Sequence, residues 1–259
     1  MAFHYSPRIV RDSSLVLYLD AGNTRSYSGT GSVWYDLTFN KIDGTLTGGP
    51  TYSSANYGSI EFDGNNDLVL INYNASNSPY DISLTGKMTW EYWAKWRQMS
   101  RLTYDGGIAF GLLFGGHTLG HFQWQLAKYF EGTGPRFVIQ VASTTQILTL
   151  DLIPGDIYYS SNAVIADNTW LNITYTYDQS TGSLIGYING ATAGGHLYGD
   201  NPATLPLPGA SYRKLTLGAS LNNDRGNSGS IGSVKIYNRV LSAAEVLQNH
   251  NAIKSRYGL

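Results

Sequence analysis

The clearest regular pattern in the chain lies between residues 168 and 190. Alternate residues there form two sets, Trp170, Asn172, Thr174 and Thr176 on one side and Leu171, Ile173, Tyr175 and Tyr177 on the other. A period of two predicts a β-strand with two different faces. Turn residues at 178–182 and a second apolar run at 184–188 complete a predicted β-hairpin. Because an isolated hairpin is only marginally stable in water, we expect its apolar face to lie against further strands.

Similar short patterns recur along the chain and are separated by turn residues. Strands are expected at residues 15–20, 44–47, 59–63, 68–71, 88–97, 108–114, 121–130, 136–142, 146–152 and 230–238. The strands at 59–63 and 68–71 are expected to form a second hairpin, and those at 136–142 and 146–152 a third. The pattern predicts an all-β antiparallel sandwich that forms one domain over residues 15–259, preceded by an extended arm at residues 1–14.

One short helix is expected close to the C-terminus. Ser242 and Glu245 have the spacing of a capping box. In this motif the serine oxygen accepts a hydrogen bond from the glutamate backbone, and the glutamate carboxylate accepts one from the serine backbone. The apolar residues that follow, Val246 and Leu247, predict a turn or two of amphipathic helix.

Composition narrows the range of functions. The 259 residues carry a formal net charge of −1, which gives no support for a nucleic-acid partner. The absence of cysteine excludes disulfides, thiolate metal sites and cysteine nucleophiles. The first ten residues lack the apolar core of a secretory signal, and no apolar run has the length of a membrane helix. We therefore expect a protein made in the cytoplasm, with no membrane partner.

Four separated segments carry a family resemblance. They are residues 15–23 (LVLYLDAGN), residues 60–67 (IEFDGNND), the hairpin that follows Trp170, and residues 231–245 (IGSVKIYNRVLSAAE). Together they resemble concanavalin A-like lectin/glucanase domains, and the laminin-G-like subtype in particular. The resemblance implies a jelly-roll sandwich of two curved antiparallel sheets, with a concave face that is often used for sugars.

Stand-alone domains of this type are also similar to structural proteins of tailed bacteriophages. That similarity implies a non-catalytic virion protein, made in the host cytoplasm, that serves as a capsid decoration or as a tail or fibre component. Its partners would be other virion proteins or copies of itself, with a cell-surface glycan as a further ligand. Because fold alone does not fix function, a free carbohydrate-binding lectin is the second hypothesis and a glycoside hydrolase the third.

The carboxylates argue against a hydrolase. A retaining glycosidase uses two carboxyl groups about 5–5.5 Å apart, and the glucanase relatives place them together on one strand. The aromatic strand at 88–97 offers only Glu91, which we expect to pair with Lys95. The protein is therefore not expected to be an enzyme.

The polar faces of two strands suggest a binding surface instead. Glu91, Trp93 and Lys95 on one strand and His121, Gln123 and Gln125 on the other would form a groove with an aromatic platform and amide donors. Sugars are bound by such combinations of aromatic contact and hydrogen bonding. An interface with another subunit would also be rich in aromatic residues and poor in charge. Both interpretations stay open.

A calcium site is the one cofactor that the sequence leaves open. Asp63, Asn65 and Asp67 have the spacing of the first three ligands of a calcium loop, but Leu68 stands where that loop needs glycine, which excludes an EF-hand. The laminin-G-like resemblance keeps a looser calcium site at Asp63 and Asp67 in view. The alternative is a turn capped by its own side chains.

The N-terminal arm is the last candidate contact. It carries Phe3, Tyr5 and Ile9 outside any predicted core. An extended segment of this kind can lie along the edge of a neighbour's sheet, so we expect these residues to contact another molecule.

Overall fold

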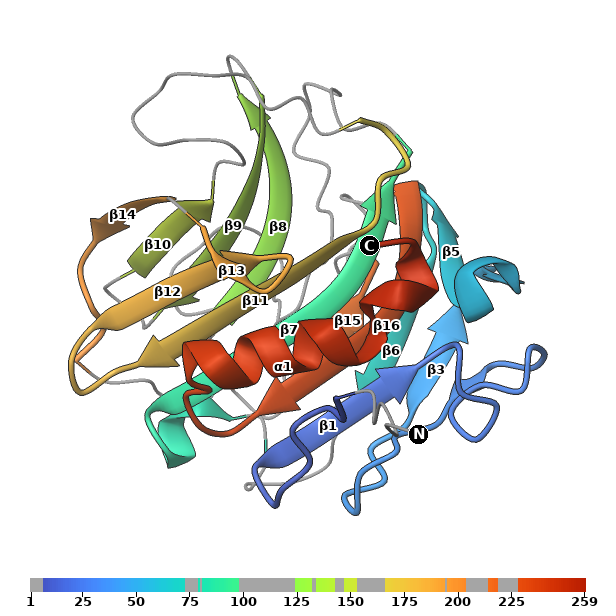
Figure 1. The fold of residues 1–259 in the computed structure, drawn as a ribbon, viewed down its shortest axis with the longest axis horizontal. Coiled ribbons are helices and arrows are strands. Elements are labelled where there is room, and N and C mark those ends of the chain that lie inside the picture. The colour runs from blue at the N-terminus through green and yellow to red at the C-terminus, as the bar shows by residue number, and fades with distance from the viewer. Residues whose placement is uncertain are drawn as a thin grey trace, which may run out of the picture.

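Antiparallel strands in three sheets and one helix make up the computed structural model of the chain (Figure 1). The structure describes residues 7–72, 79, 81–97, 124–131, 134–142, 147–152, 166–193, 195–203, 214–218 and 228–259. The sequence-based prediction of an all-β sandwich with a C-terminal helix is confirmed. No helix among these residues is long and apolar enough to cross a membrane.

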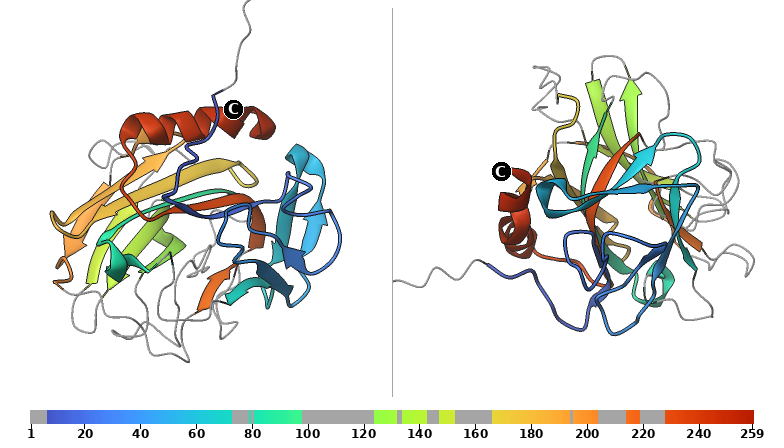
Figure 2. Two further views of the ribbon diagram at one scale, coloured as in Figure 1. Left: turned by 90° about the horizontal axis from the view of Figure 1, so that it is seen from below. Right: turned by 90° about the vertical axis from the view of Figure 1, so that its right-hand side faces the viewer.

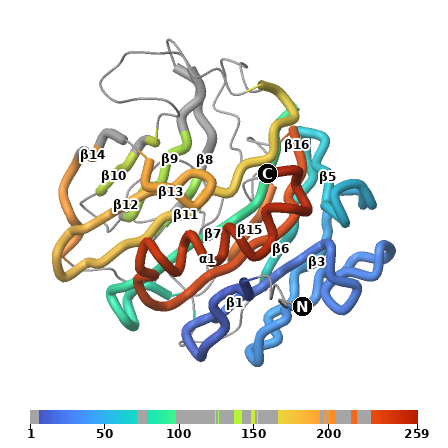
Figure 3. The backbone as a smooth tube through the Cα atoms, viewed as in Figure 1, coloured from blue at the N-terminus to red at the C-terminus, as the bar shows by residue number. Residues whose placement is uncertain are grey.

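The largest sheet has eight strands and contains the predicted hairpin. Along the sheet they run β13 (Ala191–Thr192), β12 (Ser183–Ile188), β11 (Leu171–Asp178), β7 (Lys87–Trp96), β16 (Ser228–Tyr237), β5 (Ser59–Asp63) and β4 (Thr51–Ser53), with β1 (Leu15–Asp20) paired to β16. One edge of β16 pairs with β7, and its other edge is shared between β5 and β1. Figure 3 shows β1, in blue, beside the red strand and helix from the other end of the chain.

Two four-stranded sheets pack against one face of this large sheet (Figure 2). The first runs β14 (Gly195–Gly199), β10 (Ile147–Leu152), β9 (Gly134–Ala142), β8 (Trp124–Glu131), and the second β15 (Lys214–Leu217), β6 (Leu68–Asn72), β3 (Gly44–Thr47), β2 (Val33–Trp34). The ring of Trp90 on β7 lies 5.2 Å from that of Trp124 on β8. Gly186 on β12 has no side chain, which leaves room for Leu152 of β10. The main hydrophobic core lies between these layers.

Helix α1 (Ala243–Ile253) lies on the opposite face of the large sheet (Figure 2). The predicted capping box is present, since the Ser242 side chain accepts from the Glu245 backbone and the Glu245 carboxylate accepts from Ser242. With 11 residues the helix is longer than the sequence suggested, and the 3₁₀ turn η4 (Lys254–Tyr257) extends it. Two further 3₁₀ turns are η1 (Ala55–Tyr57) and η2 (Ile82–Leu84).

Two of the three predicted hairpins are present in the structure and one is not. β9 and β10 pair as expected, and so do β11 and β12. The prediction of a hairpin at 59–71 is wrong, because β5 pairs with β4 and β16 whereas β6 pairs with β3 and β15. The short turn at 64–67 therefore carries the chain from one sheet to another. The strand expected at 108–114 lies outside the described residues.

The second half of the predicted N-terminal arm packs against its own chain. The Val10 backbone amide donates to Oδ1 of Asn249 at 2.7 Å, and the Tyr237 hydroxyl donates to the Val10 carbonyl at 2.9 Å. Ile9, expected to contact another molecule, packs against a small apolar cluster beneath α1 in its own chain. Residues 8–14 thus belong to the sandwich, while Phe3 and Tyr5 lie outside the described residues.

Candidate functional site

The polar face of β7, where the sequence placed a groove, is covered by the C-terminal segment. Glu91 and Trp93 are buried there beneath α1 and η4. The neighbouring strands bury polar residues on the same face, among them Asn172 of β11 and Lys235 of β16. The alternation predicted two faces correctly, but it could not show that the polar face would also be covered.

Glu91 is the centre of a buried hydrogen-bonded cluster. Its Oε1 lies 2.7 Å from Nζ of Lys235, and both side chains are 0% exposed. Its Oε2 accepts from Nδ2 of Asn249 on α1 at 2.6 Å. The expected pairing of Glu91 with Lys95 is wrong, because Lys235 stands directly opposite Glu91 in the sheet. Lys95 lies four residues along the same strand, about 13 Å away at the usual rise per residue.

Trp93 is held in an aromatic stack. Its ring lies 4.3 Å from that of Tyr257 and 5.3 Å from that of His250. Burial raises the pKa of the Tyr257 hydroxyl and lowers the pKa of His250, so both side chains are neutral near pH 7. The Lys95 ammonium lies over the ring of Trp170, 5.3 Å from its centroid. Trp93 therefore offers no free platform to a ligand.

The two strands expected to form one groove lie in different sheets. β7 belongs to the large sheet and β8, which carries Gln125, to one of the smaller sheets. They face each other across the core through Trp90 and Trp124, so Gln125 does not lie beside the outer face of β7. His121 and Gln123 lie outside the described residues. The predicted groove over Glu91 and Trp93 is therefore corrected to a closed interior.

Asp63 and Asp67 cap the turn between β5 and β6. Asp63 accepts from the backbone and side chain of Asn65 at 2.8 and 3.0 Å, and these bonds lower its pKa. Asp67 accepts from the Asp63 backbone at 2.9 Å, and burial raises its pKa. Within the described residues, no group of three or more His, Asp or Glu is placed to hold a metal ion. The arrangement is the self-capped turn, and calcium binding there stays a prediction.

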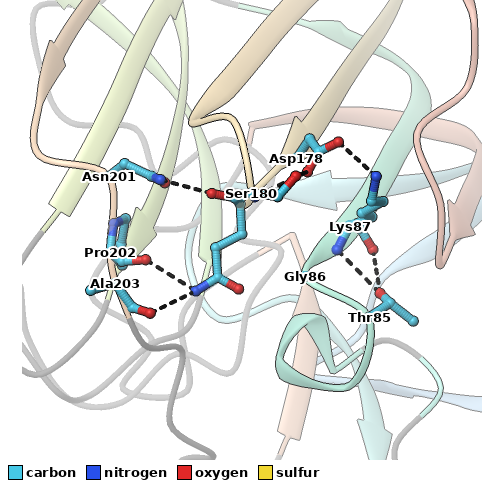
Figure 4. Close-up of a pocket in the computed structure, with 9 residues that line it drawn as sticks. Thr85, Gly86, Lys87, Asp178, Ser180, Asn201, Pro202 and Ala203 are labelled. Carbon is cyan, nitrogen blue, oxygen red and sulfur yellow. Dashed lines mark hydrogen bonds and ion pairs between the residues drawn. The ribbon is translucent and has the colours of Figure 1, made fainter.

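An accessible polar site exists at one end of the large sheet (Figure 4). It is a pocket of about 380 Å³ lined by three segments. These are residues 85–87 before and within β7, residues 178–180 at the end of β11 and in the turn that follows, and residues 201–203. The sequence marked 178–182 as a turn but gave no sign that two distant segments would meet it. The pairing of β7 with β11 brings the first two together.

Hydrogen bonds between the three segments fix the shape of the pocket. Lys87 Nζ lies 2.7 Å from Oδ2 of Asp178, and this bond lowers the pKa of that carboxyl. The Gln179 side-chain amide donates to the carbonyls of Pro202 and Ala203 at 3.1 and 3.2 Å. Asn201 Nδ2 donates to the Gln179 carbonyl at 2.9 Å. The pocket is therefore lined by fixed donors and acceptors, and Asp178, the one carboxylate among its described lining residues, is already paired.

Solved structures with the same fold include binding domains. The binding domain of Paraclostridial Mosquitocidal Protein 1 has a TM-score of 0.59 at 18% identity, over 92% of this chain and 52% of that one. The binding domain of Botulinum Neurotoxin DC in complex with SialylT has a TM-score of 0.64 at 15% identity, over 93% and 52%. This chain thus spans about half the length of both toxin domains. Domain 4 of AbnA, an extracellular arabinanase from Geobacillus stearothermophilus, in complex with arabinotriose, has a TM-score of 0.59 at 17% identity, over 93% and 100%.

Family membership follows from the sequence. A comparison with curated proteins finds no match. The family model of the laminin G type described as the concanavalin A-like lectin/glucanases superfamily matches residues 63–247, well over half of the chain. The match includes strands from all three sheets and the beginning of α1. The chain belongs to the concanavalin A-like lectin/glucanases superfamily.

Proposed function

We propose that the protein is a non-catalytic, lectin-like domain that binds carbohydrate. The observation that carries the non-catalytic part is the burial of Glu91. A catalytic acid or nucleophile must reach the substrate, whereas both oxygens of Glu91 are engaged by Lys235 and Asn249 beneath α1. The binding part is supported by the family and by two solved structures of similar fold, which are complexes with SialylT and with arabinotriose.

The test measures binding and turnover with the same ligands. The purified protein is applied to a glycan array, and each bound glycan is then incubated with it while released reducing ends are counted. We expect binding without release. Release of reducing ends from any bound glycan would contradict the non-catalytic assignment. An array with no bound glycan, together with no saturation-transfer NMR signal from free glycosides, would contradict carbohydrate binding.

The second part of the proposal concerns where the protein acts. We propose that the domain works on a bacteriophage particle, as a capsid decoration or a tail or fibre component, alongside other virion proteins or copies of itself. The support is the resemblance of the sequence to phage structural proteins. Mass spectrometry of gradient-purified particles should find the chain at a fixed ratio to the major capsid protein. Its absence from intact particles, with the protein present in the lysate, would leave a free lectin as the function.

A further inference from the structure

We infer that the polar pocket between residues 85–87, 178–180 and 201–203 binds a single neutral sugar residue. This inference rests on the proposed carbohydrate-binding function and names the site and the ligand chemistry. The pocket of about 380 Å³ falls within the size range of small-molecule sites. Three segments distant in sequence are joined there by side-chain hydrogen bonds around an accessible hollow.

The pocket is preformed. The Gln179 backbone amide donates to the Gly86 carbonyl at 2.8 Å, which joins the first segment to the second. The side chains of Gln179 and Asn201 join the second segment to the third. Tyr177 in turn donates to Oδ1 of Asn201 at 2.7 Å, which fixes the orientation of its amide group. A ligand would therefore meet ordered groups, and little loop entropy would be lost on binding.

The groups that line the pocket match hydroxyl groups, which both donate and accept hydrogen bonds. The Lys87 ammonium has three N–H donors, and its side chain is 46% exposed. The Asp178 carboxylate accepts from Lys87 and twice from Ser180, which leaves acceptor capacity on a side chain that is 18% exposed. The side-chain N–H groups of Gln179 donate to two backbone carbonyls, and its side-chain oxygen can still accept a hydrogen bond from a ligand.

Charge selects a neutral sugar over an acidic one. Lys87 and Asp178 form an ion pair at 2.7 Å, so the described lining of the pocket carries no surplus positive charge. The carboxylate of a sialic or uronic acid would lie near Asp178 and compete with it for Lys87, and like charges at short distance are unfavourable. None of the described residues that line the pocket is aromatic. A sugar would then be held mainly by hydrogen bonds that replace its hydrogen bonds to water, and the net gain of each is small. We therefore expect millimolar dissociation constants.

Saturation-transfer difference NMR with the full chain tests the inference. The probes are the methyl glycosides of glucose, galactose, mannose and arabinose, with methyl sialoside as the acidic comparison. We expect signal from at least one neutral glycoside and none from the sialoside. Gln179→Ala and Lys87→Met should each reduce the saturation-transfer signal at least fivefold. Gln248→Ala is the matched control, because that side chain also donates to a backbone carbonyl, of Arg8, but lies on α1.

The outcomes separate the two proposals. Binding of a neutral glycoside that survives both pocket substitutions would overturn the pocket as the site and leave carbohydrate binding intact. Absence of binding by the unmodified chain, with no glycan bound on the array, would overturn both. Sialoside binding that Lys87→Met abolishes would overturn the neutral-ligand assignment. If Gln179→Ala unfolds the protein, Lys87→Met still decides, since loss of a half-exposed ion pair changes stability little.

Discussion

Two lysine–carboxylate pairs on the large sheet show how surroundings decide what a residue does. Lys235–Glu91 and Lys87–Asp178 both have an N–O distance of 2.7 Å. The first pair is fully buried, and each partner compensates the charge of the other in a medium of low dielectric constant. The second is half-exposed and screened by water. The sequence singled out Glu91 but could not identify its partner, which lies 144 residues away along the chain.

Replacement of the two lysines should therefore have unequal effects on the free energy of unfolding. Lys235→Met leaves Glu91 buried without a counter-charge and should cost about 3–5 kcal/mol, the usual loss when one member of a buried pair is removed. Lys87→Met should cost less than about 1 kcal/mol, as for exposed pairs. Urea unfolding at pH 7 measures both. Similar small losses would show that water reaches Glu91 in the folded protein.

At the scale of elements, the sequence predicted helices and strands that are marked by local signals, but it did not predict how these elements pack on one another. The capping box of α1 and the hairpin of β11 and β12 each depend on residues close together in the sequence, and both were identified. Nothing in the sequence indicated that α1 would cover β7, because helix position is set mainly by tertiary packing. The turn at 64–67 has hairpin chemistry, yet β5 and β6 find their partners in different sheets. The prediction of a groove was wrong because it, too, depended on how distant elements pack on one another.

The cap of α1 should contribute measurably to stability. Ser242 accepts from the Glu245 backbone and Glu245 returns a bond to Ser242, so Ser242→Ala should lower the free energy of unfolding by about 0.5–2 kcal/mol. Ser54→Ala is the control, since Ser54 occupies the N-cap of η1 without a side-chain cap bond. Urea unfolding compares the two variants. Equal midpoints would mean that the start of α1 is frayed in solution.

His250 should make the attachment of α1 sensitive to pH. Burial lowers the pKa of His250 from 6.5, the nearby Lys254 lowers it further, and Glu91 acts in the opposite direction. Because the folded pKa lies below the unfolded one, the unfolded chain binds the proton more readily. Stability is thus fully present above pH 6.5 and decreases as the pH falls through the lowered pKa. His250→Phe keeps a ring on Trp93 and should flatten this dependence between pH 7 and 5. Unfolding midpoints with the same slope in both proteins would contradict the prediction.

At the scale of the whole molecule, the two ends of the chain stabilise each other. The sequence predicted where most strands lie, because a period of two is a local property. It did not predict that residues 8–14 pack against the C-terminal segment, because no periodic signal marks contacts between the two ends of the chain. The Asn238 backbone amide donates to the Ser14 carbonyl at 2.9 Å, and Arg239 contacts Asp12 at 2.8 Å. An arm expected to reach a neighbour is, from Arg8 onward, part of the fold.

Two truncations test whether residues 8–14 are an integral part of the fold. Removal of residues 1–7 deletes none of the contacts described above, so this shorter truncation serves as the reference. Removal of residues 1–14 deprives the buried Tyr237 hydroxyl of its acceptor and Asn249 of its donor. Each buried polar group left without a partner costs about 1–3 kcal/mol, so the longer truncation should be strongly destabilising. Because both changes remove the bond between Val10 and Asn249, the truncation and Asn249→Ala should together cost less than the sum of their separate effects. A fully additive result in urea unfolding would show that the segment and the helix are held independently.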